Sequence, residues 1–222
     1  MSKSRKVDVV DSYATIKAVA RAADAHPAPP PAELRAPGAG TTALPPKKLI
    51  ECFECGFKFQ LHGRAANTTC NKCRAVLDLT DHIVDQRWTG TIKTGGMVRV
   101  LPNGVVESGT IIANDMVLEG VIESGNVRLM RRLEVRRGCR FSEKHTKATD
   151  LLVADGATIV LTEPAEYRDV ELVGALRASL KATGTVTIHA NGFFAGHLQT
   201  AHLTVEEGGG LSADVQVDLV SP

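Results

Sequence analysis

The chain has 222 residues, a net charge of +1, 43% hydrophobic residues and only 4% aromatic residues, which is a globular composition that predicts an aliphatic core and one or two domains. Residues 150–222 carry ten acids and three bases, a net charge of −7, so we do not expect this half to bind nucleic acid. No apolar run approaches the roughly 18 residues that span a bilayer, and the N-terminus lacks the apolar region of a signal peptide, so the sequence predicts a cytoplasmic protein.

Residues 1–48 are expected to form a disordered Pro/Ala-rich tail and linker. Seven of the ten prolines lie between Pro27 and Pro46, and a segment of this composition cannot build a core. Residues 11–25 have a helix-forming composition with apolar side chains roughly on one face. They predict either a transient helix within the tail or a helix that docks on a partner or a membrane surface.

Residues 49–80 contain a cysteine module with the pattern C-x2-C-x14-C-x2-C, formed by Cys52, Cys55, Cys70 and Cys73. In a chain without an export signal, two such pairs are typical of a metal site rather than of disulfides. Two knuckles joined by a hairpin can close a tetrahedral site of four thiolates, so we predict a zinc ribbon that holds a structural Zn²⁺. Four protein ligands leave no open position, and we expect no catalysis at this zinc.

The module also carries four bases, and residues 56–75 contain no acid to offset them. These bases are Lys58, Arg64, Lys72 and Arg74. A ribbon with such charges could contact phosphates. Ribbons also present a rigid hairpin to protein partners, and a solvated basic face is common, so all three interpretations stay open.

Residues 88–222 contain a repeat in which an apolar-x-apolar pair precedes a glycine turn. The pairs are Val98/Val100, Met116/Leu118, Leu133/Val135, Leu151/Val153, Val170/Leu172, Val186/Ile188 and Leu203/Val205. Successive pairs lie 18, 17, 18, 19, 16 and 17 residues apart. The repeat predicts an all-β fold in which a parallel β-helix of about seven coils follows the zinc ribbon and the tail, because stacked units would bury a continuous aliphatic column.

Each unit has two further apolar sites, which together with the pair predict three short strands per coil. The second sites are Val105, Val121, Cys139, Ala157, Ala175, Phe193 and Leu211. The third sites are Ile111, Val127, Leu180, Leu198 and Val215, with no clear candidate in residues 144–149 of the third unit. A two-sheet sandwich is the alternative fold, but it has no reason to keep this register through seven units.

Residues 128–147 form a basic belt, in which eight bases are offset by only two acids, a net charge of +6. Five of its arginines would gather on about one coil of the helix: Arg131, Arg132, Arg136, Arg137 and Arg140. The belt is either a solvated rim or a contact surface for a polyanion, such as lipid headgroups, nucleic acid or the acidic end of a neighbouring molecule. Cys139 occupies an inward repeat position and is expected to be a small core residue.

The sequence predicts that the protein is not an enzyme. His189, His197 and His202 lie within one coil, and a histidine base on a β-helix is a feature of trimeric hexapeptide acyltransferases. The hexads of that class are not sustained here, since the coil length drifts from 16 to 19 residues. No Ser/His/Asp set, phosphate-binding glycine loop or dinucleotide fingerprint is present.

The last predicted coil has no cap after it, and an uncovered sheet edge can pair with another molecule. The expected assembly interface comprises Leu211, Val215, Val217 and Leu219. Stacking through this end would join copies of the chain into an oligomer or filament without any nucleotide.

Three segments, "LTVEEGGGLSADVQV", "TIHANGFFAGHLQTAHLTV" and "TGTIKTGGMVRVLPNGVVESGTI", resemble the bactofilins, which are polymer-forming bacterial cytoskeletal proteins. The resemblance covers about residues 88–218 and implies a right-handed β-helix, nucleotide-independent filaments, and a role in scaffolding, cell shape or envelope organisation. Some members reach the membrane through a short N-terminal segment. The resemblance therefore implies two further partners, the membrane surface and envelope proteins, and a location at the inner face of the membrane. Nucleic acid is a less favoured partner. The zinc ribbon departs from the family pattern, and it would cap one end or recruit a partner.

Overall fold

The structure is a computed structural model that describes residues 47–63 and 65–217. The expected tail, residues 1–48, falls almost wholly outside these residues, and so do Arg64 and Leu219. The described residues form strands β1 to β20 and no helix. Accordingly, no helix among them is long and apolar enough to cross a membrane.

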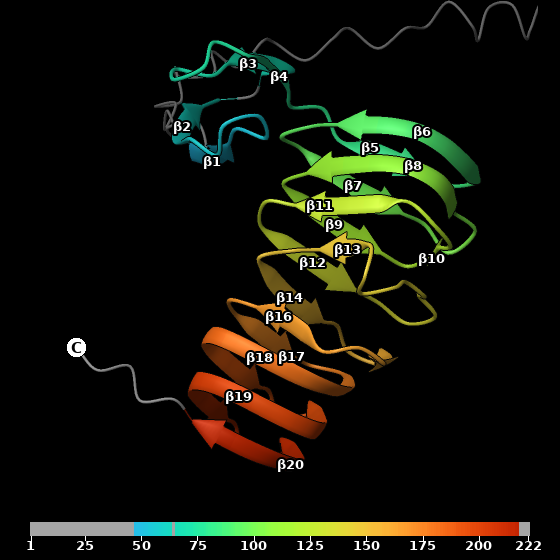
Figure 1. Ribbon diagram of the computed structural model, residues 1–222, viewed down its shortest axis with the longest axis vertical. Coiled ribbons are helices and arrows are strands. Elements are labelled where there is room, and N and C mark those ends of the chain that lie inside the picture. The colour runs from blue at the N-terminus through green and yellow to red at the C-terminus, as the bar shows by residue number, and fades with distance from the viewer. Residues whose placement is uncertain (1–46, 64, 218–222) are drawn as a thin grey trace, which may run out of the picture. The chain divides into compact units, whose positions relative to one another are not determined.

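The cysteine module consists of two antiparallel hairpins (Figure 1). Strand β1 (Lys47–Glu51) pairs with β2 (Lys58–His62), and β3 (Asn67–Thr69) pairs with β4 (Val76–Asp78). Its core is small, and the buried residues in it are Ile50, Cys52, Cys70, Leu77 and Leu79. Two of these five side chains are cysteines, so apolar packing alone gives the module little stability.

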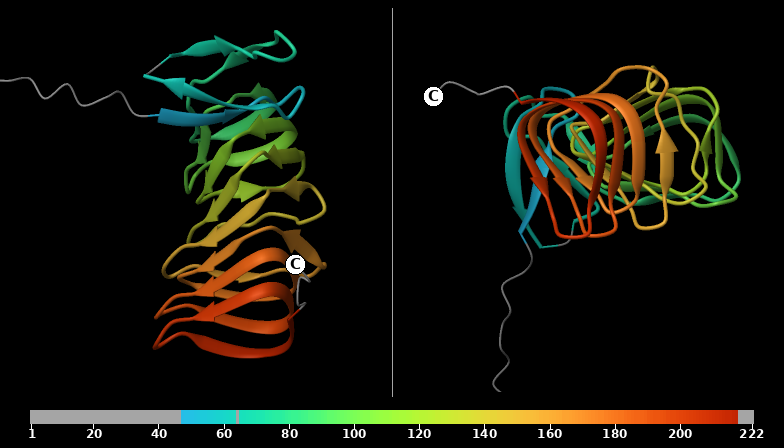
Figure 2. Two further views of the ribbon diagram at one scale, coloured as in Figure 1. Left: turned by 90° about the vertical axis from the view of Figure 1, so that its left-hand side faces the viewer. Right: turned by 90° about the horizontal axis from the view of Figure 1, so that it is seen from below.

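The other strands coil into a parallel β-solenoid of about 8 turns (Figures 1 and 2). Its first face is made by β5 (His82–Val84), β7 (Met97–Val100), β9 (Asp115–Leu118), β12 (Arg132–Val135), β14 (Asp150–Val153), β17 (Val170–Leu172) and the last residues of β18 (Ala175–Ile188) and β19 (Phe193–Val205). The seven predicted apolar pairs all lie on this face, each in register with the pair of the next turn. The predicted all-β parallel helix is therefore confirmed.

The solenoid has one turn more than the seven predicted. His82 and Val84 of β5 are the register partners of Val98 and Val100, so the ladder begins at His82. The sequence pattern missed this turn because its first inward position is a polar histidine and no glycine follows Val84.

The other two faces are formed by shorter strands and by the long strands that bend around the corners. They comprise β6 (Arg87–Lys93), β8 (Val105–Ala113), β10 (Val121–Ile122), β11 (Asn126–Leu129), β13 (Thr146–Lys147), β15 (Thr158–Val160), β16 (Ala165–Tyr167), β20 (Gly210–Val217) and the first parts of β18 and β19. The predicted third sites are correct, since Ile111, Val127, Leu180 and Leu198 are all buried.

Most of the predicted second sites are wrong by one residue. The buried residues on this face are Val106, Ile122, Leu176 and Phe194, each of which directly follows a predicted position. Both members of these dipeptides are apolar, so alternation along one strand does not distinguish the inward residue. Cys139 and Ala157 are buried as predicted.

The ladder is broken between the fourth and fifth turns. On the third face β13 pairs only with β11 and β16 pairs only with β18, while on the first face β12 and β14 stay hydrogen-bonded. Figure 1 shows β13 and β16 parted, and a hollow of about 430 Å³ is lined by residues of both strands. We call this break the seam. Because of the seam, the junction between the fourth and fifth turns has fewer strand-to-strand hydrogen bonds than the other junctions of the described solenoid.

Thr146 fills the third-face position that the sequence left open. It is in register with Val127 and is only 3% exposed, and its hydroxyl has no hydrogen-bond partner among the described residues. The threonine therefore occupies a place in the core that a valine would fill with the same shape.

We expect Thr146→Val to raise the free energy of unfolding by about 1 kcal/mol, because it removes a buried hydroxyl that makes no hydrogen bond. Thr200→Val is the matched control. Thr200 is equally buried, but its hydroxyl lies 3.2 Å from the carbonyl oxygen of Gly184 and 3.0 Å from that of His202, so this change should destabilise. Urea unfolding midpoints measure both variants, and destabilisation by both would show that the Thr146 hydroxyl does have a partner.

Candidate metal centre and exposed solenoid end

The four predicted cysteines converge at one point of the module. Their sulfur atoms all lie within 4.8 Å of one another; the Sγ atoms of Cys52 and Cys73 are 3.6 Å apart and those of Cys55 and Cys70 are 3.7 Å apart. A tetrahedral site with metal–sulfur bonds of about 2.3 Å requires sulfur–sulfur distances of about 3.8 Å. The cluster therefore fits a metal ion held by four thiolates.

The two knuckles have the same backbone geometry, which explains how short sequences position the ligands. The N–H of Gly56 donates to the carbonyl of Cys52 at 2.8 Å, and the N–H of Arg74 donates to that of Cys70 at 3.0 Å. The two donors have φ values of +69° and +64°, a region that favours glycine. The positive φ of Gly56 in the first knuckle could be predicted from the sequence, because the residue is a glycine. The positive φ of its counterpart Arg74 could not.

The backbone also favours the ligating form of one cysteine. Hydrogen bonds from the N–H groups of Cys73 and then Lys72 lower the pKa of Cys70 to about 6, although burial opposes them. The thiolate is the form that binds a metal. Four soft sulfur ligands in a tetrahedral arrangement are typical of zinc or iron sites, so the described geometry supports a metal centre without deciding which ion it holds.

The last turn lies at the end of the solenoid, and the view from below in Figure 2 looks onto this turn. Strand β20 is the final strand of the sheet, and its outer edge pairs with no other strand of the described chain. The inward residues of this turn are Leu203, Val205, Leu211, Val215 and Val217, in register with the buried Val186, Ile188, Phe194, Leu198 and Thr200 of the turn before.

The exposure of these residues changes sharply over one turn. Leu211 and Val217 are 39% and 49% exposed, whereas Phe194, the register partner of Leu211, is fully buried. Three of the four residues of the predicted assembly interface therefore lie on the open end, and Leu219 lies outside the described residues. The prediction missed Val205, which is 41% exposed and lies in the same turn. We define Val205, Leu211, Val215 and Val217 as the open end.

Three arginines of the predicted basic belt lie in or directly beside β12 and form ion pairs with acids of the same turn or of turns one or two away. The pairs are Arg131–Asp115 at 3.2 Å, Arg132–Glu171 at 2.9 Å, Arg136–Glu119 at 2.7 Å and Arg136–Glu134 at 2.6 Å. Hydrogen bonds from Arg99 and then Arg136 lower the pKa of Glu119. These arginines are therefore partly neutralised within the molecule.

The other two arginines of the prediction, Arg137 and Arg140, are exposed and have no ion pair among the described residues. They lie in the connection between β12 and β13, where Arg140 makes an isolated bridge to Val121. The five arginines thus do not form one surface. Contact with a polyanion through this set stays a prediction.

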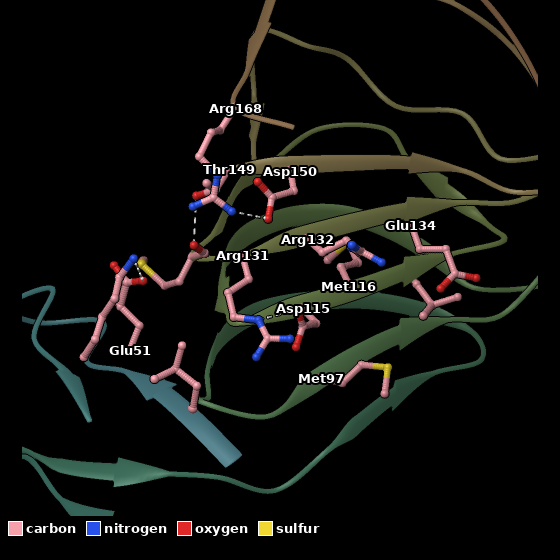
Figure 3. A pocket seen from close by; sticks show the side chains of 14 residues that line it. Glu51, Met97, Asp115, Met116, Arg131, Arg132, Glu134, Thr149, Asp150 and Arg168 are labelled. Carbon is pink, nitrogen blue, oxygen red and sulfur yellow. Dashed lines mark hydrogen bonds and ion pairs between the residues drawn. The ribbon is translucent and has the colours of Figure 1, made fainter. Parts of the chain in front are cut away.

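A hollow of about 530 Å³ lies between the β1–β2 hairpin and the first face (Figure 3). Six of its eight charged side chains are paired with one another, for example Arg168 with Asp150 at 2.9 Å and Lys58 with Glu51 at 3.3 Å. Burial raises the pKa of Asp150. The residues that line it include no histidine, cysteine or serine, so this hollow offers no nucleophile of those types.

The three histidines considered as catalytic candidates are not brought together. His189 pairs with Glu206 at 2.9 Å and His197 with Asp214 at 3.7 Å. Each acid is on the turn that follows its histidine, so these pairs link successive turns. No shared site is formed by these residues.

No family model, no curated protein and no solved structure matches the chain. The fold and the site nevertheless define a class of protein. It is a parallel β-solenoid preceded by a four-cysteine module that could hold a metal ion.

Proposed function

We propose that the protein is a non-enzymatic cytoskeletal or scaffold protein whose solenoid assembles end to end without nucleotide. The open end carries this proposal, because it combines an unpaired strand edge with apolar residues whose register partners in the preceding turn are buried. A second solenoid end placed against it would continue both the hydrogen-bond ladder and the core. This is the mode of assembly implied by the resemblance to bactofilins, and we propose membership of that family.

The remaining parts receive recruiting roles in this proposal. The four cysteines hold structural zinc, and the ribbon with the N-terminal tail recruits partners, such as envelope proteins or the membrane surface. The protein then acts in the cytoplasm, at the inner face of the membrane where such partners are bound. The ribbon is joined to the solenoid within one compact unit, which suits a module that positions a partner relative to the assembly.

Electron microscopy and light scattering test the assembly. We expect ordered oligomers or fibres of the wild-type chain, and their loss in Val215→Lys/Val217→Lys, because two charges would then be buried at each junction. Ser212→Lys/Gln216→Lys is the matched control, since it adds the same charge to the alternate, outward positions of β20 and should still assemble. A wild-type chain that is monomeric at high concentration, or a Val215/Val217 variant that assembles normally, would contradict the proposal.

The second candidate is a zinc-ribbon protein that binds nucleic acid or another polyanion, with the solenoid as a spacer or oligomerisation module. The exposed Lys72 and Arg74 favour it. Lys58 does not, because it pairs with Glu51 at 3.3 Å, and Arg64 is outside the described residues. Steeply salt-dependent DNA binding that is lost when these four bases are neutralised would support this candidate.

A further inference from the structure

The third face of the third and fourth turns carries positive charge that has no acidic partner. Arg128 of β11 and Lys147 of β13 are direct register neighbours. Both are exposed, and neither forms an ion pair within the described part of the chain. Like charges placed opposite each other destabilise a sheet, and the arginines in or beside β12 avoid this by pairing with acids. The Arg128–Lys147 pair therefore makes no ion pair that would offset this repulsion.

A hollow of about 220 Å³ lies beside this pair. The residues that line it are Thr110, Ile112, Asn126, Val127, Arg128, Lys144, His145 and Lys147, with no carboxylate among them. Lys144 also pairs with Glu163 at 2.9 Å. The hollow thus combines an apolar part, at the partly exposed Ile112, with several cationic or polar donors.

We propose that this hollow binds a phosphate group, and we call it the phosphate site. The guanidinium of Arg128 offers a planar set of donors that matches phosphate oxygens, and Lys147 adds a second full charge beside it. Asn126 and Thr110 provide neutral donors. Ile112 would contact the carbon atoms that carry a phosphate ester, whether that ester is a phospholipid headgroup or a free small molecule.

Arg128 and Lys147 are two of the four bases of the basic belt that form no ion pair among the described residues; the other two are Arg137 and Arg140. The arginines in or beside β12 stabilise the stack of turns through ion pairs, whereas Arg128 and Lys147 make no such contact. A bound anion would remove the repulsion between these two side chains. The proposal does not depend on assembly, because the site lies on the side of the solenoid and not at the open end.

The experiment compares Arg128→Gln/Lys147→Gln with the matched control Arg177→Gln/Lys181→Gln. The control removes the same charge from two exposed residues of the sixth turn that have no ion pair among the described residues. One arm titrates inorganic phosphate by calorimetry at constant ionic strength. The other arm floats the full chain with vesicles of phosphatidylcholine and phosphatidylglycerol, against vesicles of phosphatidylcholine alone.

We expect the wild-type chain and the control to bind in at least one arm, and the Arg128/Lys147 variant to bind about tenfold more weakly or worse, as expected for the loss of charge-assisted hydrogen bonds. Binding of inorganic phosphate identifies a site for free phosphate esters, and binding only to the anionic vesicles identifies a headgroup site. Equally weakened binding in both variants would show that binding depends only on the net charge of the protein, and it would overturn the proposal. Absence of wild-type binding in both arms at low salt would overturn it as well.

Discussion

Removal of the metal by a strong chelator, or the substitution Cys70→Ser, is expected to unfold residues 47–80 while the solenoid keeps its β-sheet structure. The module buries only five side chains of its own, and two of them, Cys52 and Cys70, belong to the metal site. Binding of zinc to such modules contributes on the order of 10 kcal/mol at neutral pH. Without the metal, no stabilising contribution of this size remains, because so small an apolar core cannot offset the conformational entropy that the chain loses on folding.

Hydrogen–deuterium exchange with peptide resolution measures this effect, since it reports the module and the solenoid separately. Protection of β1 to β4 should be lost on chelation, and protection of the first face should persist. Cys139→Ser is the control, because Cys139 lies in the solenoid core, where burial raises the pKa of its thiol to about 11. A module that stays protected after the chelator has removed all metal would show that the four cysteines are not its main source of stability.

The register of the first face could be predicted from the sequence because each turn repeats an apolar-x-apolar pair before a turn. Side chains alternate between the two sides of a strand, so only one orientation of the strand buries both apolar residues of the pair, as at Leu133 and Val135. The second face lacks this asymmetry, since Val105 and Val106 are both apolar, and only pairing between turns decides which is inside. The seam was not predictable for the same reason. It is a property of two strands, β13 and β16, that lie about one turn apart and fail to pair.

The candidate sites that depend on residues close in sequence could be predicted, whereas those that depend on contacts between turns could not. The cysteine spacing is local, because each knuckle positions two ligands within four residues, and so the ligand set was predictable. Which arginines of the basic belt form ion pairs depends on distant residues. Arg136 pairs with Glu119, 17 residues away in the chain, and Arg132 pairs with Glu171, 39 residues away. These separations are close to one and two turns of the repeat. A search for opposite charges at the repeat period would have separated the paired arginines from the unpaired Arg128.

Gly109→Ala is expected to lower the free energy of unfolding by about 3 kcal/mol or more, a large effect for the addition of one methyl group. Gly109 lies at a corner of the solenoid, in register with Gly90 of the preceding turn, and both have positive φ, +117° and +130°. A Cβ atom on Gly109 would overlap the carbonyl oxygen of Gly90. The backbone cannot give way without breaking the hydrogen bonds of β6 and β8, because this contact is between two main chains.

Gly156→Ala separates this contact from the cost of the backbone conformation. Gly156 also has a positive φ, +70°, but a Cβ atom there would meet no atom within 4 Å, so we expect a loss of only about 1 kcal/mol. Urea unfolding of both variants, followed by circular dichroism, gives the comparison. The two glycines are of one type and both lie on the solenoid, so the difference between the variants measures how closely the turns approach at the Gly90–Gly109 corner. Equal losses would mean that this corner can open by the width of a methyl group.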